Sequence, residues 1–445
     1  MTEQTTPENT VPDVALEAGA EKARKNAELI QSGLARRYRA ERRFRFYGRA
    51  AIFFGLLAVV VLFTDIISKG HGAFRQTFIQ LSIHYDADLL DIQDAADTKQ
   101  LAAGNYQALI KKSLRERFGD VGGRREKREL YRIVSDSAGY QLFDRLTEKP
   151  ERLGSTEILW FPVDDDIDTY FKSRSDKEPF VGRVSERQIS FVDQLVETSD
   201  IALQFNRGFF THGDSREPEL AGIGGAVVGS LLTLVVTLLL SFPIGVSAAI
   251  YLEEFAPKNR WTDFIEVNIN NLAAVPSIIF GLLGLAIFIN FFGVPRSAPV
   301  LGGLVLTLMT LPTIIISSRA SIKAVPPSIR QAAYGMGASD VQVVLHHVLP
   351  LAMPGMLTGA IIGMAQALGE TAPLLMIGMV AFIVDVPTGF TDAATVLPVQ
   401  IFLWADAPER AFVEKTSGAI MVLLAFLIVM NTLAVILRKR LERRW

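Results

Sequence analysis

An ionisable side chain inside a long uncharged stretch is the first candidate for chemistry in this sequence. Glu370 interrupts the apolar run 348–384, Gln366 lies one helical turn before it on the same face, and Thr371 follows it directly. A carboxylate within a membrane-spanning helix costs about 2.5–3.5 kcal/mol, so it needs a partner or a water-filled path. We therefore expect Gln366, Glu370 and Thr371 to line a translocation path. The alternative is that Glu370 lies near the outer headgroups, which the length of the run permits.

The sequence contains none of the common catalytic or nucleotide-binding motifs. It has no GxxxxGK[ST], HExxH or GxSxG, no cysteine and only five histidines. A formal net charge of -2 also argues against a nucleic-acid partner. We expect no enzymatic activity, no metal site and no cofactor bound by this chain, so any ATP would be hydrolysed by a partner subunit. The acidic run Asp164, Asp165, Asp166 and Asp168 lacks the Gly and the terminal Glu of a calcium loop, which favours a solvated turn over a cation site.

Apolar stretches of membrane-spanning length position these residues. A bilayer core needs about 20 consecutive helical residues. Stretches of roughly that length or more cover 50–67, 221–252, 267–295, 297–318, 348–384 and 416–437. The sequence therefore predicts an α-helical polytopic membrane protein with six transmembrane helices.

Charges at the ends of these stretches predict their orientation. Segment 36–49, RRYRAERRFRFYGR, is strongly basic and leads into the first transmembrane helix, so that 36–68 forms one unit. The tail 438–445 has five Lys/Arg in eight residues, whereas loop 385–415 has five acids and two bases. Because basic flanks stay inside, both termini are expected to be cytoplasmic. Residues 1–35 are polar without an apolar period, which predicts a disordered cytoplasmic tail.

The charged region 69–219, between the first and second stretches, is expected on the extracytoplasmic side. Its many basic residues do not contradict this orientation, because long translocated loops escape the charge rule. The apolar patches 157–163 and 187–196 indicate a folded domain with both helices and strands. We therefore predict an inserted extracytoplasmic α+β domain.

Segment 319–350 is polar but organised, and it lies on the cytoplasmic side in this topology. Pro326 and Pro327, followed by Ser328, are expected to start a helix that Gly335 and Gly337 break. Ser339 and Asp340 can cap a second helix, which is expected to run toward Leu349 and Pro350. Helix connections in bundles usually have about 2–8 residues, so this one is too long for a mere connector. We interpret it as a docking element.

Small residues recur every four positions in the fifth stretch. Gly355, Gly359, Gly363 and Ala367 fall on one helix face, which lets another helix approach closely. A neighbouring helix is expected to pack there.

The docking segment resembles the EAA loop of ABC importer membrane subunits. Gln331 stands where that family has Glu, and His347 replaces an aliphatic residue, but the spacing is otherwise intact. In that family the loop forms the short coupling helix that seats in a cleft of the ATPase subunit. The resemblance implies coupling through loop 320–349 and assigns the contact to Arg330, Gln331, Ala332, Ala333, Gly337, Leu349 and Pro350.

A second resemblance covers about 200–445. GETAPLL (369–375), SREPELAGI (215–223) and LPVQIF (397–402) resemble the PstA-type membrane subunits of phosphate importers, and the upstream part resembles an extension found in a subset of them. The resemblance implies a type I ABC importer permease fold for 220–445 in the bacterial inner membrane. It also implies a second, different permease subunit, an ABC ATPase dimer that binds ATP and Mg, an extracytoplasmic phosphate-binding protein and inorganic phosphate as cargo.

One departure from the PstA pattern concerns charge. Many such subunits have an Arg where this sequence has Gln366, and the arginines flanking the central spans here are Arg296 and Arg319, both at membrane ends. An anion path should present donors and cations. We therefore predict that the partner permease supplies most of the positive charge and that Glu370 positions an Arg from it.

Two alternative functions stay open at this point. The cargo could be another oxyanion, such as phosphonate or molybdate, because cargo choice lies mainly in the binding protein. The chain could instead be a membrane-anchored sensor or scaffold that acts through its external domain. For 70–215 the hypothesis is a platform for the binding protein, which rests only on the side of the membrane where the region is expected.

Overall fold

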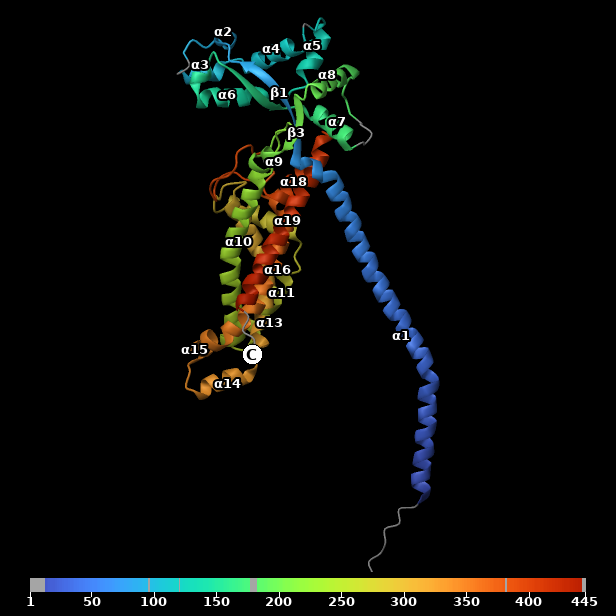
Figure 1. Cartoon of the computed structure of the whole chain (residues 1–445). Helices are drawn as coiled ribbons and strands as arrows, with labels where there is room; N and C mark the ends of the chain where they lie inside the picture. Colours follow the sequence, from blue (N-terminus) through green and yellow to red (C-terminus); the bar gives the residue numbers. More distant parts are fainter. Residues whose placement is uncertain (1–12, 95–96, 120, 177–181, 381, 442–445) are drawn as a thin grey trace, which may run out of the picture. The chain divides into compact units, whose positions relative to one another are not determined.

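Figure 1 shows the computed structural model, in which helices predominate. It describes residues 13–441 except 95–96, 120, 177–181 and 381. The chain divides into two units, Met1–Asp65 and Ile66–Trp445, which are treated separately below.

The first unit consists of a single long helix, α1 (Asp13–Gly70), whose last turns belong to the second unit. The expectation of a disordered tail is wrong for residues 13–35, which are helical. This stretch is rich in Ala, Glu, Lys and Arg, which favour helix, and Lys25 pairs with Glu21 one turn away at 3.0 Å. Residues 1–12 of the expected tail lie outside the described part. A candidate span, Ser32–Phe74, covers the first predicted stretch.

A three-stranded antiparallel sheet forms the centre of the region after α1. Its order is β2-β1-β3, with Leu81 of β1 opposite Leu159 of β2 and Phe78 opposite Ala202 of β3. Alternate residues of β1, including Ile79 and Leu81, are buried under the helices of this region. The elements are η1 (His71–Phe74), β1 (Arg75–His84), α2 (Ala87–Leu90), α3 (Thr98–Ala103), α4 (Tyr106–Phe118), α5 (Arg124–Tyr131), α6 (Ala138–Glu148), η2 (Pro150–Arg152), β2 (Thr156–Pro162), α7 (Asp165–Asp176), α8 (Glu186–Glu197), β3 (Ile201–Phe205) and α9 (Arg207–Thr211). We call this region the insert.

A helical bundle follows the insert. Its elements are α10 (Gly224–Ile250), η3 (Tyr251–Phe255), α11 (Arg260–Leu272), α12 (Ser277–Leu283), η4 (Gly284–Ile289), α13 (Pro299–Lys323), α14 (Pro327–Gly335), α15 (Asp340–Gln342), η5 (Val343–Val348), α16 (Leu349–Gly369), α17 (Ala372–Met376), α18 (Leu397–Ala405) and α19 (Ala411–Leu441). Helix α13 packs between α10 and α16, and α19 packs on α16 and α18.

The described residues hold five helices that could cross a membrane, or six if one bent pair counts as a span. The predicted span 267–295 corresponds to this bent pair, because α11 and α12 meet at 106°. Pro276 caps α12 there, and a proline both lacks an N–H and disfavours helix in the residue before it. The expected run 348–384 is also interrupted, since α16 ends at Gly369.

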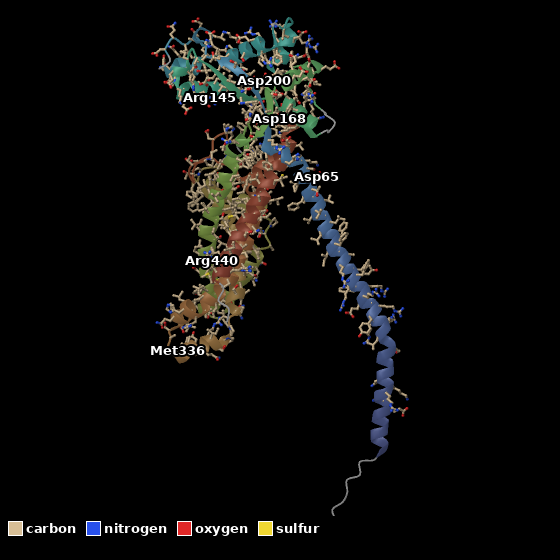
Figure 2. The ribbon with its side chains drawn as sticks, in the orientation of Figure 1. Asp65, Arg145, Asp168, Asp200, Met336 and Arg440 are labelled. Carbon is tan, nitrogen blue, oxygen red and sulfur yellow. The ribbon has the colours of Figure 1, made fainter. Side chains whose placement is uncertain are left out.

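The insert and the segment around α14 lie at opposite ends of the bundle. Figure 2 shows Met336 and Arg440 at one end and Asp168 towards the other. Contacts agree with this view, because Lys172 of the insert reaches Glu414 at the start of α19, whereas Arg330 of α14 reaches Glu254 after α10. We call these the insert end and the loop end.

Candidate functional site

The polar loop after α13 folds as its sequence predicts at its start and its turn. Helix α14 begins at Pro327, and Gly337 ends the turn with a φ of 85°, a conformation that glycine adopts without strain. Ser339 caps the next helix, and the Gln342 side chain returns the bond in a capping box. The second helix reaches Leu349 and Pro350, as predicted, but it does not end there. It continues into α16, so that one candidate span runs from Asp340 to Gly369.

One face of this loop is buried against the ends of three spans. Ala333 is 1% exposed and shares an apolar cluster with residues of α10, α13 and α16. Ala332 and Gln331 are exposed beside it, and Leu349 and Pro350 are half-buried at the start of α16. Of the residues assigned to coupling, Ala333 therefore belongs to the packing and Gln331 and Ala332 to the free surface.

The opposite face of the loop presents apolar side chains to solvent. Tyr334 is 49% exposed, Met336 75%, Val341 54% and Leu345 49%. Tyr334 lies on α14 and Met336 caps it, whereas Val341 and Leu345 lie at the start of the candidate span Asp340–Gly369. Single exposed apolar residues are ordinary, but several at one end of the bundle indicate a contact surface. The described chain thus presents an apolar surface at the loop end, on a helix whose inner face is fixed.

Arg330 attaches α14 to two spans. Its guanidinium group donates to Glu254 Oε1 at 2.7 Å, to the carbonyl oxygen of Val325 at 2.7 Å and to that of Ile322 at 3.0 Å. Glu254 belongs to η3 after α10, while Ile322 lies in the last turn of α13. Arg330 therefore points into the protein and holds the loop in place.

A second, partly buried charge cluster lies beside it. Arg319 of α13 pairs with Glu266 of α11 at 2.5 Å and with Glu253 of η3 at 3.4 Å, and Lys323 approaches Glu253 at 3.4 Å. The sequence analysis missed Glu253, Glu254 and Glu266. The sequence did contain a signal for this contact: acidic residues follow one apolar stretch, and basic residues follow another. If both stretches end on the same side of the membrane, these acids and bases are expected to pair. The charge of Arg319 is thus balanced by Glu253 and Glu266. The side chain of Arg296, the other arginine predicted to flank the central spans, is exposed.

The small face of α16 packs against α13. A Cβ added to Gly355 would collide with Ser321, one at Gly359 would collide with Ser317, and one at Gly363 would touch Thr310. Ala367 is 1% exposed in an apolar cluster with residues of α13. The neighbouring helix that the spacing requires thus belongs to this chain.

Helix α16 ends directly before Glu370, one of the residues predicted to line the translocation path. Glu370 caps α16 with an extended backbone, at φ -78° and ψ 129°, and Thr371 starts the short helix α17. Gln366 is exposed on α16, while Glu370 and Thr371 are half-buried. In the part of the chain that the structure describes, the Glu370 carboxylate has no hydrogen-bond or ion-pair partner. Broken helices at membrane depth occur where the backbone lines a cavity or is covered by protein.

The insert is attached to the bundle by buried polar contacts. Lys172 of α7 lies between Asp168 and Glu414 of α19, 2.7 Å from a carboxylate oxygen of each. Glu219, in the segment before α10, accepts a hydrogen bond from the Ser135 hydroxyl at 2.5 Å. Burial raises the pKa of Glu219 to about 7, although that hydrogen bond opposes the shift. The insert is therefore fixed to the start of α19 and to the segment before α10.

The acidic run at the start of α7 stays clustered in the folded chain. Carboxylate oxygens of Asp164, Asp165 and Asp166 lie within 4.8 Å of one another. Burial, followed by the charge of Asp165, raises the pKa of Asp164 to about 7. Asp168 faces away from this cluster: it accepts from the Thr77 amide at 2.8 Å and pairs with Lys172. The expected solvated turn is thus half-buried.

Two family models match the chain. Residues 31–179 match a domain of unknown function (DUF3333), and residues 241–445 match a binding-protein-dependent transport system inner membrane component. The second match includes the loop, the small face of α16 and the break at Glu370.

Individual relatives agree with the second match. The phosphate transport system permease protein PstA of Mycobacterium leprae is 30% identical over 242 residues, which are 53% of this chain and 78% of that protein. The probable ABC transporter permease protein YqgI of Bacillus subtilis is 34% identical over 173 residues, which are 39% of this chain and 58% of that protein. A chain of the MetNI methionine ABC transporter in an inward-facing form covers 50% of this chain and 98% of its own length, with 19% identity and a TM-score of 0.39.

A bundle of five or six candidate spans with an organised polar loop defines a membrane permease subunit, which is not an enzyme. The chain belongs to the family of binding-protein-dependent transport system inner membrane components, the permeases of ABC importers, and within it to the PstA type. A DUF3333 segment precedes its permease domain.

Proposed function

We propose that this chain is a permease subunit of an ATP-driven phosphate importer and forms half of the translocation path. Its relative in Mycobacterium leprae is a phosphate transport permease, which supports phosphate as the cargo. The complex would contain a second, different permease, an ABC ATPase dimer that binds ATP and Mg, and an extracytoplasmic phosphate-binding protein. This chain would bind no cofactor itself.

The single observation that carries the coupling role is the two-faced loop around α14. Its inner face is fixed by Ala333 and Arg330, and its outer face presents Tyr334 and Met336. A helix held in this way can pass a push from a docked ATPase to the spans without bending. Loop 320–349, with Gly337 at its turn, is thus the proposed contact with the ATPase.

The proposed topology places the loop end and both termini in the cytoplasm and the insert outside. The opposite placement of the insert and α14 along the bundle supports it, as do Arg438, Lys439 and Arg440 in the last turn of α19. In this topology 69–219 is an extracytoplasmic domain and 220–445 is the permease domain. A cleft of about 1330 Å³ lies between the insert and the loop at 384–386, and it makes the insert a candidate platform for the binding protein.

Phosphate would pass the break after α16. Gln366, Glu370 and Thr371 offer polar groups there, and the Glu370 carboxylate is free to receive a cation from another subunit. Arg319 is not available for this task, because Glu253 and Glu266 already neutralise it. The positive charge that an anion requires would therefore come mainly from the partner permease.

The test is uptake of radiolabelled phosphate in cells that lack this chain and receive a variant of it. Ala333→Pro breaks the interior of α14, where a proline removes a hydrogen bond and clashes with the preceding turn. Ser328→Pro is the matched control, because the first turn of a helix tolerates proline. We expect wild type and Ser328→Pro to restore uptake and Ala333→Pro to abolish it at equal membrane levels.

The alternatives predict other outcomes of this experiment. Another oxyanion as cargo would leave phosphate uptake indifferent to the chain, while uptake of phosphonate or molybdate would follow the same pattern of variants. If the chain were a sensor or scaffold, the Ala333→Pro variant would keep its function, since such a protein need not bind an ATPase. Normal phosphate uptake by Ala333→Pro would exclude the coupling role.

A further inference from the structure

The helix before the first span carries a dense set of arginines. Segment 36–49 contains seven arginines and one acid, Glu41, which pairs with Arg45. Four aromatic side chains are interspersed and strongly exposed, with Tyr38 at 65%, Phe44 at 78%, Phe46 at 66% and Tyr47 at 65%. We call this segment the arginine collar. Its charge exceeds what the orientation of a single span requires.

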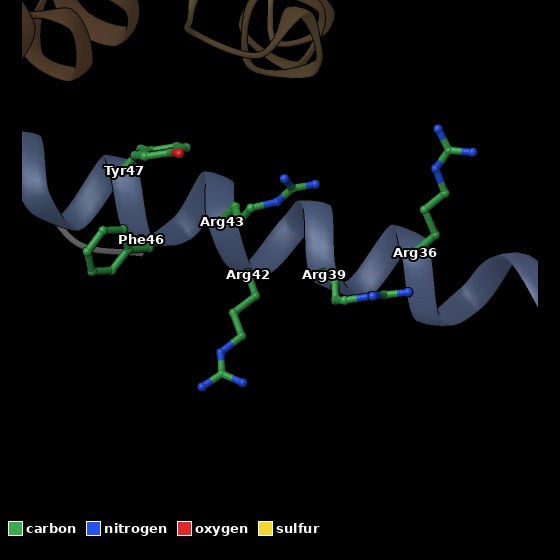
Figure 3. A pocket seen from close by; sticks show the side chains of 6 residues that line it. All are labelled: Arg36, Arg39, Arg42, Arg43, Phe46 and Tyr47. Atoms are coloured by element: carbon green, nitrogen blue, oxygen red, sulfur yellow. The ribbon is translucent and has the colours of Figure 1, made fainter.

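The arginines surround the helix and do not form a one-sided stripe. Successive residues of an α-helix are rotated by about 100°, so positions 36, 37, 39, 42, 43, 45 and 49 are distributed over all sides. Figure 3 shows the guanidinium groups of Arg36 and Arg42 on opposite sides of α1. A folded protein partner would contact one face of a straight helix. Lipid headgroups surround a membrane-entering helix on every side.

The length of the apolar stretch pulls the collar into the headgroup layer. Between Arg49 and Asp65 the helix has about 15 uncharged residues, or about 22 Å, whereas the hydrocarbon core is about 30 Å thick. Because the uncharged helix is shorter than the hydrocarbon core is thick, Arg49 and Arg45 are drawn to the edge of that core, from which their side chains extend to the membrane surface. Phe46 and Tyr47 then lie at the depth where aromatic residues are enriched.

We propose that the arginine collar binds the phosphate groups of anionic phospholipids around the first span. Guanidinium groups form paired hydrogen bonds with phosphate, and aromatic rings between them anchor the helix at headgroup depth. A lipid shell held in this way would fix the depth of α1 in the bilayer. The proposal depends on membrane insertion alone, and it holds whether or not phosphate is the cargo.

The test measures lipid selectivity of the full-length chain in vesicles of phosphatidylcholine with about one-fifth phosphatidylglycerol. Spin-labelled versions of the two lipids report which one occupies the protein surface. The variant Arg42→Gln, Arg43→Gln, Arg49→Gln removes charge from the collar. A matched control, Arg124→Gln, Arg125→Gln, Arg128→Gln, removes the same charge from the exposed surface of α5 in the insert. Exchange of the same three collar residues for Lys keeps the charge.

We expect the collar Gln variant to reduce the preference for phosphatidylglycerol about threefold or more, and the Lys and α5 variants to keep most of it. Unchanged selectivity in the collar variant, with insertion verified, would overturn the proposal. An equal loss in the α5 control would also overturn it, because net charge would then be the cause. If millimolar inorganic phosphate displaced the lipid, the collar would be a site for free phosphate and the lipid proposal would be wrong.

Discussion

Replacing Arg330 by Met removes the contact that holds α14 to the bundle. The substitution keeps the length and apolar stem of the side chain but deletes the guanidinium group, which bonds Glu254 and two carbonyl oxygens at the end of α13. We expect the loop to open locally while the spans remain packed.

The magnitude follows from burial. The side chains of Arg330 and Glu254 are 21% and 13% exposed, so solvent screens the pair little. Removing one partner of a buried ion pair typically costs about 3–5 kcal/mol, because the remaining charge is left uncompensated. At 1.4 kcal/mol per factor of ten, the lower value increases the open population of α14 more than about 100-fold.

Hydrogen exchange of the amides of 327–335, measured by mass spectrometry on the purified complex, reports this opening. Two variants calibrate the result. Lys323→Met removes a base that is 58% exposed and 3.4 Å from Glu253, and it should leave exchange nearly unchanged. Arg330→Met combined with Glu254→Gln removes the uncompensated carboxylate and should restore part of the protection.

ATP hydrolysis and transport, measured on the same samples, connect this opening to coupling. A loosened α14 should preserve membrane insertion and basal hydrolysis but lower the phosphate transported per ATP. Protection of 327–335 within about twofold of wild type in Arg330→Met would refute the anchoring role, since even 1 kcal/mol would change it about fivefold.

Three further predictions concern packing, pH and the translocation path. Gly359→Leu should lower the melting temperature in detergent, because its side chain overlaps Ser317. Gly369→Ala should leave the melting temperature unchanged, because a Cβ there meets open space, and equal melting temperatures of the two variants would contradict the packing. The pKa of Glu219 in the folded chain is about 7, above its unfolded value. Its contribution to stability is therefore present at about pH 4 and is lost as the pH rises through about 7. The melting temperature should fall over this pH range in wild type and should fall less in Glu219→Gln. Glu370→Gln should reduce phosphate uptake at normal expression, and full uptake would exclude a role in positioning a cation.

Local signals in the sequence predict the loop well. Pro327 fixes the start of α14, Gly337 provides the positive φ of the turn, and Ser339 caps the next helix. Each of these effects depends on a residue's own backbone or on a partner three positions away, so no knowledge of the fold is needed. The four-residue spacing from Gly355 to Ala367 is a local signal of the same kind.

Features that depend on distant residues could not be predicted in the same way. The ion pairs of Arg319 and Arg330 join segments that are more than fifty residues apart in the sequence. In a hydropathy profile, the acidic partners of these arginines mark only where an apolar stretch ends. The bend at Pro276 was hidden because an uncharged stretch looks the same whether its helix is straight or broken. Helix 13–35 was missed because polar composition was interpreted as disorder without summing its helix propensity.

Buried ion pairs occur at both ends of the bundle and join different elements at each. At the loop end Arg319 links η3, α11 and α13, and at the insert end Lys172 links α7 and α19. Because breaking such pairs is costly, each end is expected to move as one body. The helices of the bundle are interrupted at two places, the bend at Pro276 and the break at Glu370, where helical hydrogen bonds are already missing. During a switch between inward- and outward-facing states, we therefore expect the helices to bend at these two places while the two ends tilt as rigid bodies. A displacement of α14 would then be transmitted through α13 and α16 to Glu370.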